Sequence, residues 1–436
     1  MNITLVAILM VVLIILAGFQ KRVPMYLALL FIPVGAALCL GYSIPEISTS
    51  LLAKMNDSMA SGGYLLLFAI IYFSMLTESG MFETMINGLM RLLGGRMNVI
   101  LLMILTTAVA LLCGLTAQIT VTFLIIFPVL LPLYKKYGLS RETCFILCQT
   151  GLAVMMILPW SAGAINVSVV LGCEPQELAS AASRMALCMI PGIIFQWCYY
   201  AYRHKKAVGS FKLEVVEDVE ESTEKSDNQL RRPKLFWANL LVFVVLMVGL
   251  VAFKIPAYLV FMAGAAYMII VNYPKDFGKI IQKNAARYVD TLLMMLGISV
   301  YLAIFMDMGM VKALGETLIA VFPSFLMQHL HIIMLVPIVI FVRYIPSRVY
   351  TTLYPVFMAV GAQFGLTGMA VIAPYLVNMT LATGSTPFNT ANVVGCSLLE
   401  LDLNQYCKHA VRIQTVTNII SIAFALIFGV IPLAKI

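Results

Sequence analysis

The chain has 436 residues, of which 62% are hydrophobic and 11% are charged, and its formal net charge is +8 at pH 7. Typical soluble domains have about 25% charged residues, so the composition excludes an ordinary soluble enzyme. The basic residues cluster in loops, where they set membrane orientation, so the positive charge does not indicate binding to nucleic acid. We therefore expect an all-α polytopic membrane protein embedded in a lipid bilayer.

Apolar runs near the length of about 20 residues that a bilayer-spanning helix needs predict the elements of the first half. The first run has no basic segment and no cleavage site of the kind found in signal peptides, so we expect it to be retained as a span. The predicted spans are 3–18, 24–43, 63–78, 141–173 and 178–202, with an amphipathic stretch at 82–94 and a re-entrant hairpin at 97–113 and 119–134; the fourth span is interrupted at 159–163.

The second half repeats this plan. Its predicted elements are spans at 235–253, 256–272 and 289–307, an amphipathic stretch at 310–321, a hairpin at 332–344 and 349–361, a broken span at 366–396 and a last span at 410–434. His329 and His331 precede the second hairpin, and we expect them to be solvated. Residues 206–234 are polar and charged, which predicts a flexible linker. The predicted organisation is a first repeat at 1–205, the linker, and a second repeat at 235–436.

Two internal matches relate the halves. YFSMLTESGMFETMINGLMRLLG (72–94) aligns with YLAIFMDMGMVKALGETLIAVFP (301–323), and INVSVVLGCEPQEL (165–178) aligns with FNTANVVGCSLLEL (388–401). If each hairpin returns to its own side, each half crosses five times, so the second repeat must be inverted. Duplicated bundles with interrupted helices are typical of secondary transporters, which bind substrate where the halves meet.

The positive-inside rule gives an orientation for this chain in a cell (inner) membrane. A cytoplasmic linker with both termini outside places most basic residues on the inner side. These include Lys135, Lys136, Arg141, Lys279, Lys283 and Arg287.

Four polar breaks are expected to meet near the bilayer midplane: the two hairpin tips and the two interruptions of broken spans. Free N–H groups at helix N-termini suit a carboxylate, and carbonyls freed by unwinding suit a coupling cation, either H⁺ or Na⁺. The alternative for each hydroxyl is a packing role between helices. The candidate substrate ligands are Thr116, Gln118, Thr120, Ser161, Asn166, Arg343, Ser347, Arg348, Thr383, Ser385, Thr386 and Asn389.

The two arginines of the second tip are the most informative candidates. A charge inside an apolar segment is costly unless it faces a cavity or a partner, and arginine can bind a carboxylate through two parallel hydrogen bonds. The alternative for Arg343 and Arg348 is that they reach the outer membrane interface. The sequence has no nucleotide-binding loop, nucleophile elbow or His/Glu metal pattern, so we expect neither an enzyme nor a bound cofactor.

Several segments resemble the citrate–metal–proton symporter family of the ion transporter superfamily. They are GYLLLFAIIYFSMLTESGMFETMI (63–86), LLPLYKKYGLS (130–140), MMILPW (155–160) and PKLFWANLL (233–241). The resemblance covers essentially the whole chain. It implies a homodimer, an elevator-like mechanism, and proton-coupled uptake of citrate bound to a divalent cation.

The chain departs from that family at the substrate region. The family's first tip is acidic and glycine-rich, whereas the region around Gln118 has no carboxylate, and Arg348 follows the second tip. Loss of acidic oxygens removes ligands that a divalent ion prefers. The sequence therefore predicts a secondary active transporter of a citrate-like di- or tricarboxylate, with a metal-free anion preferred. The alternatives are a cation/proton antiporter, which needs a buried carboxylate not found at the four breaks, and a non-transporting membrane sensor.

Overall fold

The computed structural model describes residues 2–20, 23–92, 98–208, 230–253 and 255–433, and these residues form helices without any strand. The first half contains α1 (Ile3–Phe19), α2 (Met25–Cys39), α3 (Ile44–Ser58), a π-helical turn (Met59–Gly63), α4 (Tyr64–Glu78), α5 (Met81–Leu92), α6 (Val99–Gly114), α7 (Ile119–Lys136), α8 (Arg141–Met155), α9 (Ala162–Leu171), α10 (Pro175–Leu187) and α11 (Ile190–Val208).

The second half is built from the same types of element. It contains a short 3₁₀ turn (Pro233–Leu235), α12 (Phe236–Val251), α13 (Ala257–Tyr267) with a π turn (Met268–Asn272), α14 (Phe277–Leu302) with a π turn (Ala303–Asp307), α15 (Met310–Val321), α16 (Ser324–Gln328), α17 (Leu330–Leu335), α18 (Ile338–Tyr344), α19 (Ser347–Thr351), α20 (Tyr354–Gln363), α21 (Gly368–Thr383), α22 (Thr390–Leu398) and α23 (Leu403–Ile427).

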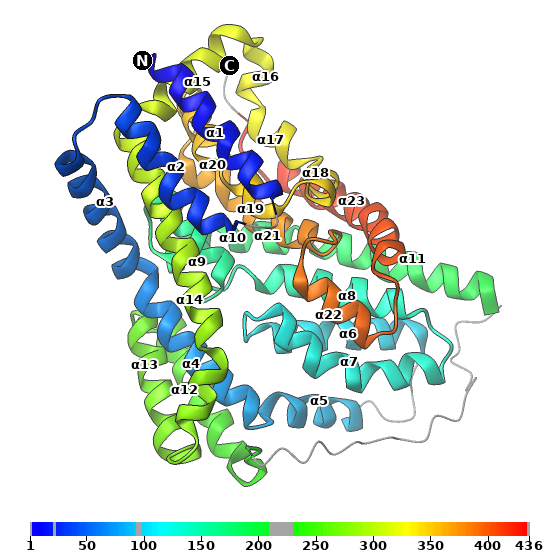
Figure 1. Cartoon of the computed structure of the whole chain (residues 1–436). Helices are drawn as coiled ribbons and strands as arrows, with labels where there is room; N and C mark the ends of the chain where they lie inside the picture. Colours follow the sequence, from blue (N-terminus) through cyan, green and yellow to red (C-terminus); the bar gives the residue numbers. More distant parts are fainter. Residues whose placement is uncertain (1, 21–22, 93–97, 209–229, 254, 434–436) are drawn as a thin grey trace.

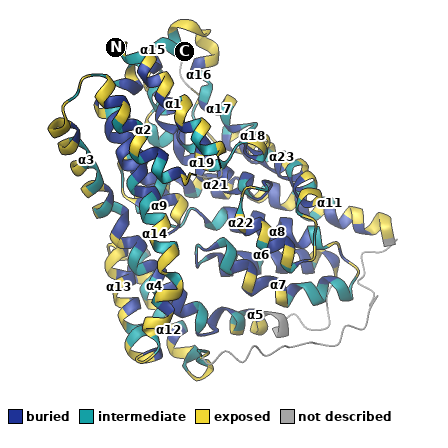
Figure 2. Ribbon diagram, viewed as in Figure 1, coloured by how far each residue is buried: buried dark blue, intermediate teal, exposed yellow. Residues whose placement is uncertain are grey.

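The lengths and apolar character of these helices make the chain a multi-pass membrane protein. Among the described residues, five helical stretches are long and apolar enough to cross a bilayer, and a bent pair, α10 with α11, adds a sixth. Large apolar side chains on the outer helices are exposed, as on α12, where Trp237 is 76% and Leu241 65% accessible (Figure 2). In a membrane, lipid covers such surface.

Both broken spans are interrupted where the sequence predicts. The fourth span stops at Met155 and resumes at Ala162, and its counterpart stops at Thr383 and resumes at Thr390. The amphipathic helix α15 has the predicted bounds of 310–321. Proline and glycine release backbone groups from the helical ladder at both breaks.

Three predicted spans have the wrong bounds. The helix predicted at 63–78 begins at Ile44, because α3 continues through a π-helical turn into α4, and the helix predicted at 289–307 begins at Phe277. Their first turns are amphipathic, so apolar runs alone did not reveal them. The last span, predicted at 410–434, is helical from Leu403 to Ile427.

Proline explains two further differences. The span predicted at 178–202 is two helices bent by 41°, and Pro191 stands in the first turn of the second. Pro337 and Pro355 each interrupt one arm of the predicted second hairpin, and Pro346 lies at its tip, before α19. A proline N cannot donate to the helical ladder, so helices restart at these positions. Most of the predicted linker, at 209–229, lies outside the described residues.

Helices of the first half pack against helices of the second half (Figure 1). Helix α2 packs along α14, and α13 packs along α4. A glycine stands at each crossing: a Cβ on Gly297 would lie 3.1 Å from the Leu29 Cβ, and one on Gly264 would lie 2.8 Å from the Tyr72 ring. Small residues allow helices in membranes to approach closely, so each long helix is held by the shorter helix of the other half.

The helices form two groups in Figure 1. The first helix group comprises α2, α3, α4, α12, α13 and α14; the second comprises α6, α7, α8, α11, α21, α22 and α23. In the second group a buried polar network joins α8, α11 and α23: Gln196 Nε2 donates to Gln414 Oε1 (3.2 Å) and Thr417 Oγ1 (2.8 Å), and Thr150 Oγ1 donates to Gln196 Oε1 (3.0 Å). Satisfied buried hydrogen bonds of this kind fix the relative register of helices.

The first and last described segments of the chain lie at the same end of the molecule. Helix α1 packs against α15, and His331 Nε2 donates to the carbonyl of Pro432, 3.0 Å away, beyond the end of α23 (Figure 1). His331 is only 4% exposed, so the expectation that it is solvated was wrong. Its role in the structure is to fasten the C-terminal segment to α17.

Candidate functional site

A cavity of about 950 Å³ lies between the two helix groups, and all four predicted breaks reach it. Its volume is at the upper end of the range of about 300–1,000 Å³ that small-molecule sites occupy. Seven of the twelve candidate ligands line it, namely Thr120, Asn166, Ser347, Arg348, Thr383, Thr386 and Asn389.

The first half contributes one polar side chain from its hairpin tip and one from its broken span. Thr120 follows the tip at the start of α7, and Asn166 lies on α9 just past the break. Asn166 Oδ1 is buried and has no hydrogen-bond partner among the described residues. A buried oxygen of this kind is free to bind a donor that enters the cavity.

Three other candidates of the first half lie behind the cavity wall and hold its shape. Thr116 Oγ1 accepts from the Gln118 backbone N–H (3.3 Å). Ser161 Oγ accepts from the Ala164 backbone N–H (3.0 Å) and thereby caps the N-terminus of α9. These contacts fit the packing alternative for Thr116 and Ser161, because both side chains already have local partners.

The second half contributes more polar groups. Ser347 and Arg348 begin α19 after the second tip, and Asn389 caps α22 by accepting from the Ala391 backbone N–H (3.1 Å). Ser385 is fully buried and lies outside the lining. Arg343 also lies outside the lining; its guanidinium is 6.0 Å from the centre of the Tyr344 ring. Of the two arginines at the tip, therefore, Arg348 lines the cavity and Arg343 does not.

Helix α14 adds charged groups that the sequence interpretation did not place at the site. Arg287 and Asp290 both line the cavity, and Arg287 Nη1 donates to Gln118 Oε1. Arg348 Nη2 lies 3.5 Å from Asp290 Oδ2, and their side chains are 52% and 51% exposed. A half-exposed pair at this distance is weak, so Arg348 can exchange Asp290 for an incoming anion.

Arg287 escaped detection because the predicted span began at residue 289, whereas Asp290 lay just inside that span and was not singled out. Arg287 was assigned to a cytoplasmic loop, whereas it lies within α14, a 26-residue helix. The argument against antiport considered only buried carboxylates at the four breaks, and Asp290 adds a half-exposed carboxylate from α14 to the cavity. The spacing of three residues between Arg287 and Asp290, which puts both on one face of a helix, was the available signal.

Among the described lining residues, two arginines face one aspartate, so these groups give the cavity a net positive charge. Hydroxyl and amide groups supply further donors around them. Arginine binds carboxylates with two parallel hydrogen bonds. Among the described residues, no group of three or more His, Cys, Asp or Glu side chains could hold a metal ion. The arrangement can therefore bind an anion with several carboxylates.

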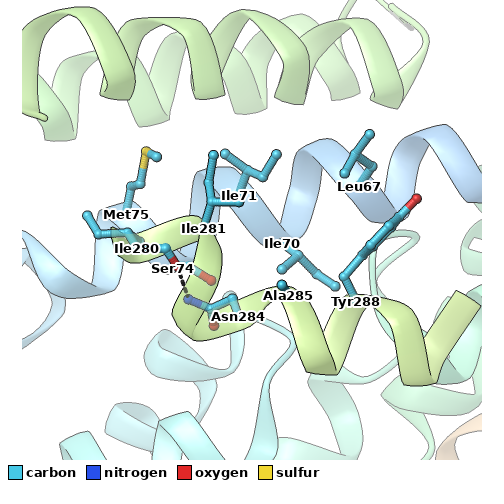
Figure 3. A pocket seen from close by; sticks show the side chains of 10 residues that line it. All are labelled: Leu67, Ile70, Ile71, Ser74, Met75, Ile280, Ile281, Asn284, Ala285 and Tyr288. Atoms are coloured by element: carbon cyan, nitrogen blue, oxygen red, sulfur yellow. Dashed lines mark hydrogen bonds between the residues drawn. The ribbon is translucent and has the colours of Figure 1, made fainter. Parts of the chain in front are cut away.

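A second cavity, of about 90 Å³, lies between α4 and α14 and is apolar (Figure 3). Ile70, Ile71 and Ile280 line it, and Asn284 turns its amide away to donate to the Ile280 carbonyl (2.9 Å). Almost all of its surface is apolar, so it does not resemble a site for a polar substrate.

Comparison with known proteins identifies the family of the chain. A family model described as "Citrate transporter" matches residues 1–384. Three proteins of Bacillus subtilis (strain 168) are similar over almost their whole length: a "Citrate transporter" (23% identical; 94% of this chain, 95% of that one), an "Uncharacterized transporter YraO" (24%; 95% and 95%) and a "Mg(2+)/citrate complex secondary transporter" (23%; 95% and 95%). These relatives are transporters and not enzymes. The chain belongs to the citrate transporter family.

Proposed function

We propose that the protein is a secondary active transporter of a small organic anion, a citrate-like di- or tricarboxylate. The observation that carries the proposal is the cavity between the helix groups, reached by all four breaks and lined by Arg287 and Arg348. A transporter needs such a site at a place where the backbone can rearrange. The driving ion is H⁺ or Na⁺.

The charge of the cavity favours a metal-free anion over a metal complex. A divalent cation is usually held by several carboxylate or carbonyl oxygens. Asp290 is the one carboxylate among the described lining residues, and Arg348 already lies opposite it. One relative is named for a Mg²⁺/citrate complex. A preference for the metal-free anion would make the substrate of this chain different from the one in that name.

We also propose that the two halves are inverted repeats, at 1–205 and 235–436, joined by a cytoplasmic linker at 206–234. The exchanged packing of α2 with α14 and α13 with α4 supports this arrangement. The shared location of both chain ends also supports it, with the termini outside the cell membrane. In an elevator-like cycle, the second helix group would move past the first and carry the breaks that follow α6, α8 and α21. The homodimer follows from the family resemblance.

Uptake into proteoliposomes tests the proposal. Purified protein would be given radiolabelled citrate with either EDTA or excess Mg²⁺, under an inward pH or Na⁺ gradient. We expect saturable uptake that needs a gradient and persists in EDTA. Uptake only with Mg²⁺ would overturn the preference for a metal-free anion. If no di- or tricarboxylate is taken up, the alternative of a non-transporting membrane sensor would be favoured.

Asp290 supports one other candidate function, cation/proton antiport, because a carboxylate in a membrane cavity can exchange a proton for a cation. Antiport predicts Na⁺-driven proton movement in vesicles without any organic anion, and its loss in Asp290→Asn. Carboxylate transport predicts no Na⁺-driven proton movement when the carboxylate substrate is absent.

A further inference from the structure

One turn of α14 contacts both hairpin tips. Arg287 Nη1 donates to Gln118 Oε1 at the first tip, and Asp290 Oδ2 lies 3.5 Å from Arg348 Nη2, just after the second tip. Arg287 and Asp290 are three residues apart, which places both side chains on one face of α14. The two tips come from different halves of the chain, so this face joins both of them to the same helix.

These contacts connect the two helix groups. Helix α14 packs along α2, α3 and α4, and it lies at the edge of the first group toward α7 (Figure 1). Gln118 directly precedes α7, which belongs to the second group, and α18 of the second hairpin packs along α21 and α23 of that group. Any sliding of one group past the other must therefore break both contacts.

Gln118 is placed to act on the arginine and not on the substrate. It is 5% exposed and lies outside the cavity lining, whereas Arg287 lines the cavity. Its side chain forms no cap on α7, so its amide oxygen is available to Arg287. Gln118 is therefore a positioning residue, because it can influence a bound anion only through Arg287.

Both contacts are weaker than those that a carboxylate substrate would offer. None of the ion pairs of the described residues involves Arg287, whose acceptor at the tip is a neutral amide oxygen. A guanidinium binds an ionised carboxylate through two parallel hydrogen bonds, more strongly than it binds a neutral oxygen. The pair of Arg348 with Asp290 is half-exposed and is weak for that reason. An anion with several carboxylates can therefore displace both partners.

We propose that this turn of α14 is a latch, which holds both tips while the cavity is empty and is opened by the anion. The anion binds Arg287 in place of Gln118, and it binds Arg348 in place of Asp290. The inference rests on the proposed transport function and adds a difference between the loaded and the empty protein. Net uptake requires the empty protein to return with the latch closed, whereas exchange of one anion for another does not.

Two substitutions of Gln118 test the latch because they have opposite effects. Gln118→Ala removes the competitor for Arg287, so the affinity for citrate should rise several-fold in isothermal titration calorimetry. Gln118→Glu offers Arg287 a carboxylate, so the affinity for citrate should fall by roughly tenfold or more, the effect of a hydrogen bond between charged groups. If Gln118 only supported the fold, both variants would lose affinity.

Gln363→Glu is the matched control for the added negative charge. Gln363 is the last residue of α20 and lies outside the cavity lining. This variant should bind citrate with the affinity of the natural protein.

Transport by the full-length protein in proteoliposomes measures what the latch does. Uptake of radiolabelled citrate into vesicles loaded with unlabelled citrate gives the rate of exchange, and uptake into vesicles without citrate gives the rate of net transport. In the natural protein, exchange should be faster than net transport by roughly tenfold, since the empty protein must break a hydrogen bond to a charged group. Gln118→Ala should narrow this difference, and Gln118→Glu should widen it.

Hydrogen exchange at the first tip gives a measurement that needs no substrate. Backbone amides exchange when a segment opens locally. In the protein without citrate, the amides of residues 115–119 should exchange faster in Gln118→Ala than in the natural protein, and more slowly in Gln118→Glu.

Three outcomes would overturn the latch: affinity shifts of the same direction in the two Gln118 variants, equal rates of exchange and net transport in the natural protein, or a loss in Gln363→Glu as large as in Gln118→Glu. Citrate uptake together with any of these results would remove the latch and leave the transport function standing. Opposite shifts in hydrogen exchange, without uptake of any di- or tricarboxylate, would leave the contact between α14 and the tip and remove the transport function.

Discussion

Replacement of Arg348 by alanine should reduce the affinity for the anion by more than the loss of one hydrogen-bond donor would explain. Arg348 lines the cavity and lies 3.5 Å from Asp290. Its removal takes away a donor to the substrate and also leaves the Asp290 carboxylate uncompensated beside the bound anion. Both effects lower the affinity for the anion.

The magnitude can be worked from the geometry. A hydrogen bond to a charged group contributes about 1.5–3 kcal/mol, and the half-exposed position of Arg348 favours the lower end. Repulsion between Asp290 and an anion about 7 Å away, at an effective dielectric constant near 20, adds roughly 2 kcal/mol. The sum of about 3.5 kcal/mol corresponds to a roughly 300-fold loss of affinity. The double variant Arg348→Ala/Asp290→Asn should recover about 30-fold of it.

Citrate binding to purified protein, measured by isothermal titration calorimetry, would test this reasoning. Arg343→Ala is the matched control, since Arg343 is on the same hairpin but outside the cavity lining, and it should bind normally. Elution as a single species in size exclusion would show that the variants are folded. Normal binding by Arg348→Ala, or a double variant no better than the single one, would refute the assignment.

Three further predictions concern other parts of the structure. Arg287→Met should lower citrate affinity at least tenfold, with partial recovery in Arg287→Lys, because lysine cannot form two parallel hydrogen bonds; the same titration measures both. Gln196→Leu removes three buried hydrogen bonds of about 1 kcal/mol each, so its thermal unfolding midpoint should fall while citrate affinity is kept. A hydrogen bond from Lys135, with the charges of Lys135 and Arg141, holds the pKa of Glu400 below its ordinary value of 4.5. Its stabilising effect is therefore present above about pH 4.5 and lost as pH falls through the lowered pKa; Glu400→Gln should flatten the acid limb of stability against pH, and an unchanged limb would contradict this.

Local signals in the sequence were enough to predict the breaks. Pro159 marks the first interruption, and Gly384 and Pro387 mark the second. These residues cannot continue a helical ladder without cost, so the positions of the breaks follow from chemistry that is local to the chain. Their meeting at one cavity followed from assuming that the halves are related by inversion.

The missing parts of the site depend on distant contacts. Arg287 sits on an amphipathic stretch of α14 that resembles a charged loop when hydropathy alone is considered, and only the fold brings it to Gln118. Arg343 and Arg348 are the same residue type on the two sides of one tip, yet Arg348 reaches the cavity and Arg343 does not. Packing decides which face of a short helix points toward the cavity. Prolines contribute because they determine where each short helix of the hairpin begins.

The most direct test of the central claim is substrate protection at all four breaks. One position from each break would be changed to cysteine in a background in which the exposed Cys39 and Cys198 are serine; the positions are Thr120, Asn166, Ser347 and Asn389. If the four breaks form one anion site, saturating citrate should slow labelling by a membrane-impermeant thiol reagent at every position, with the same half-maximal citrate concentration. Protection at some positions and not at others, or with clearly different concentrations, would contradict a single shared cavity.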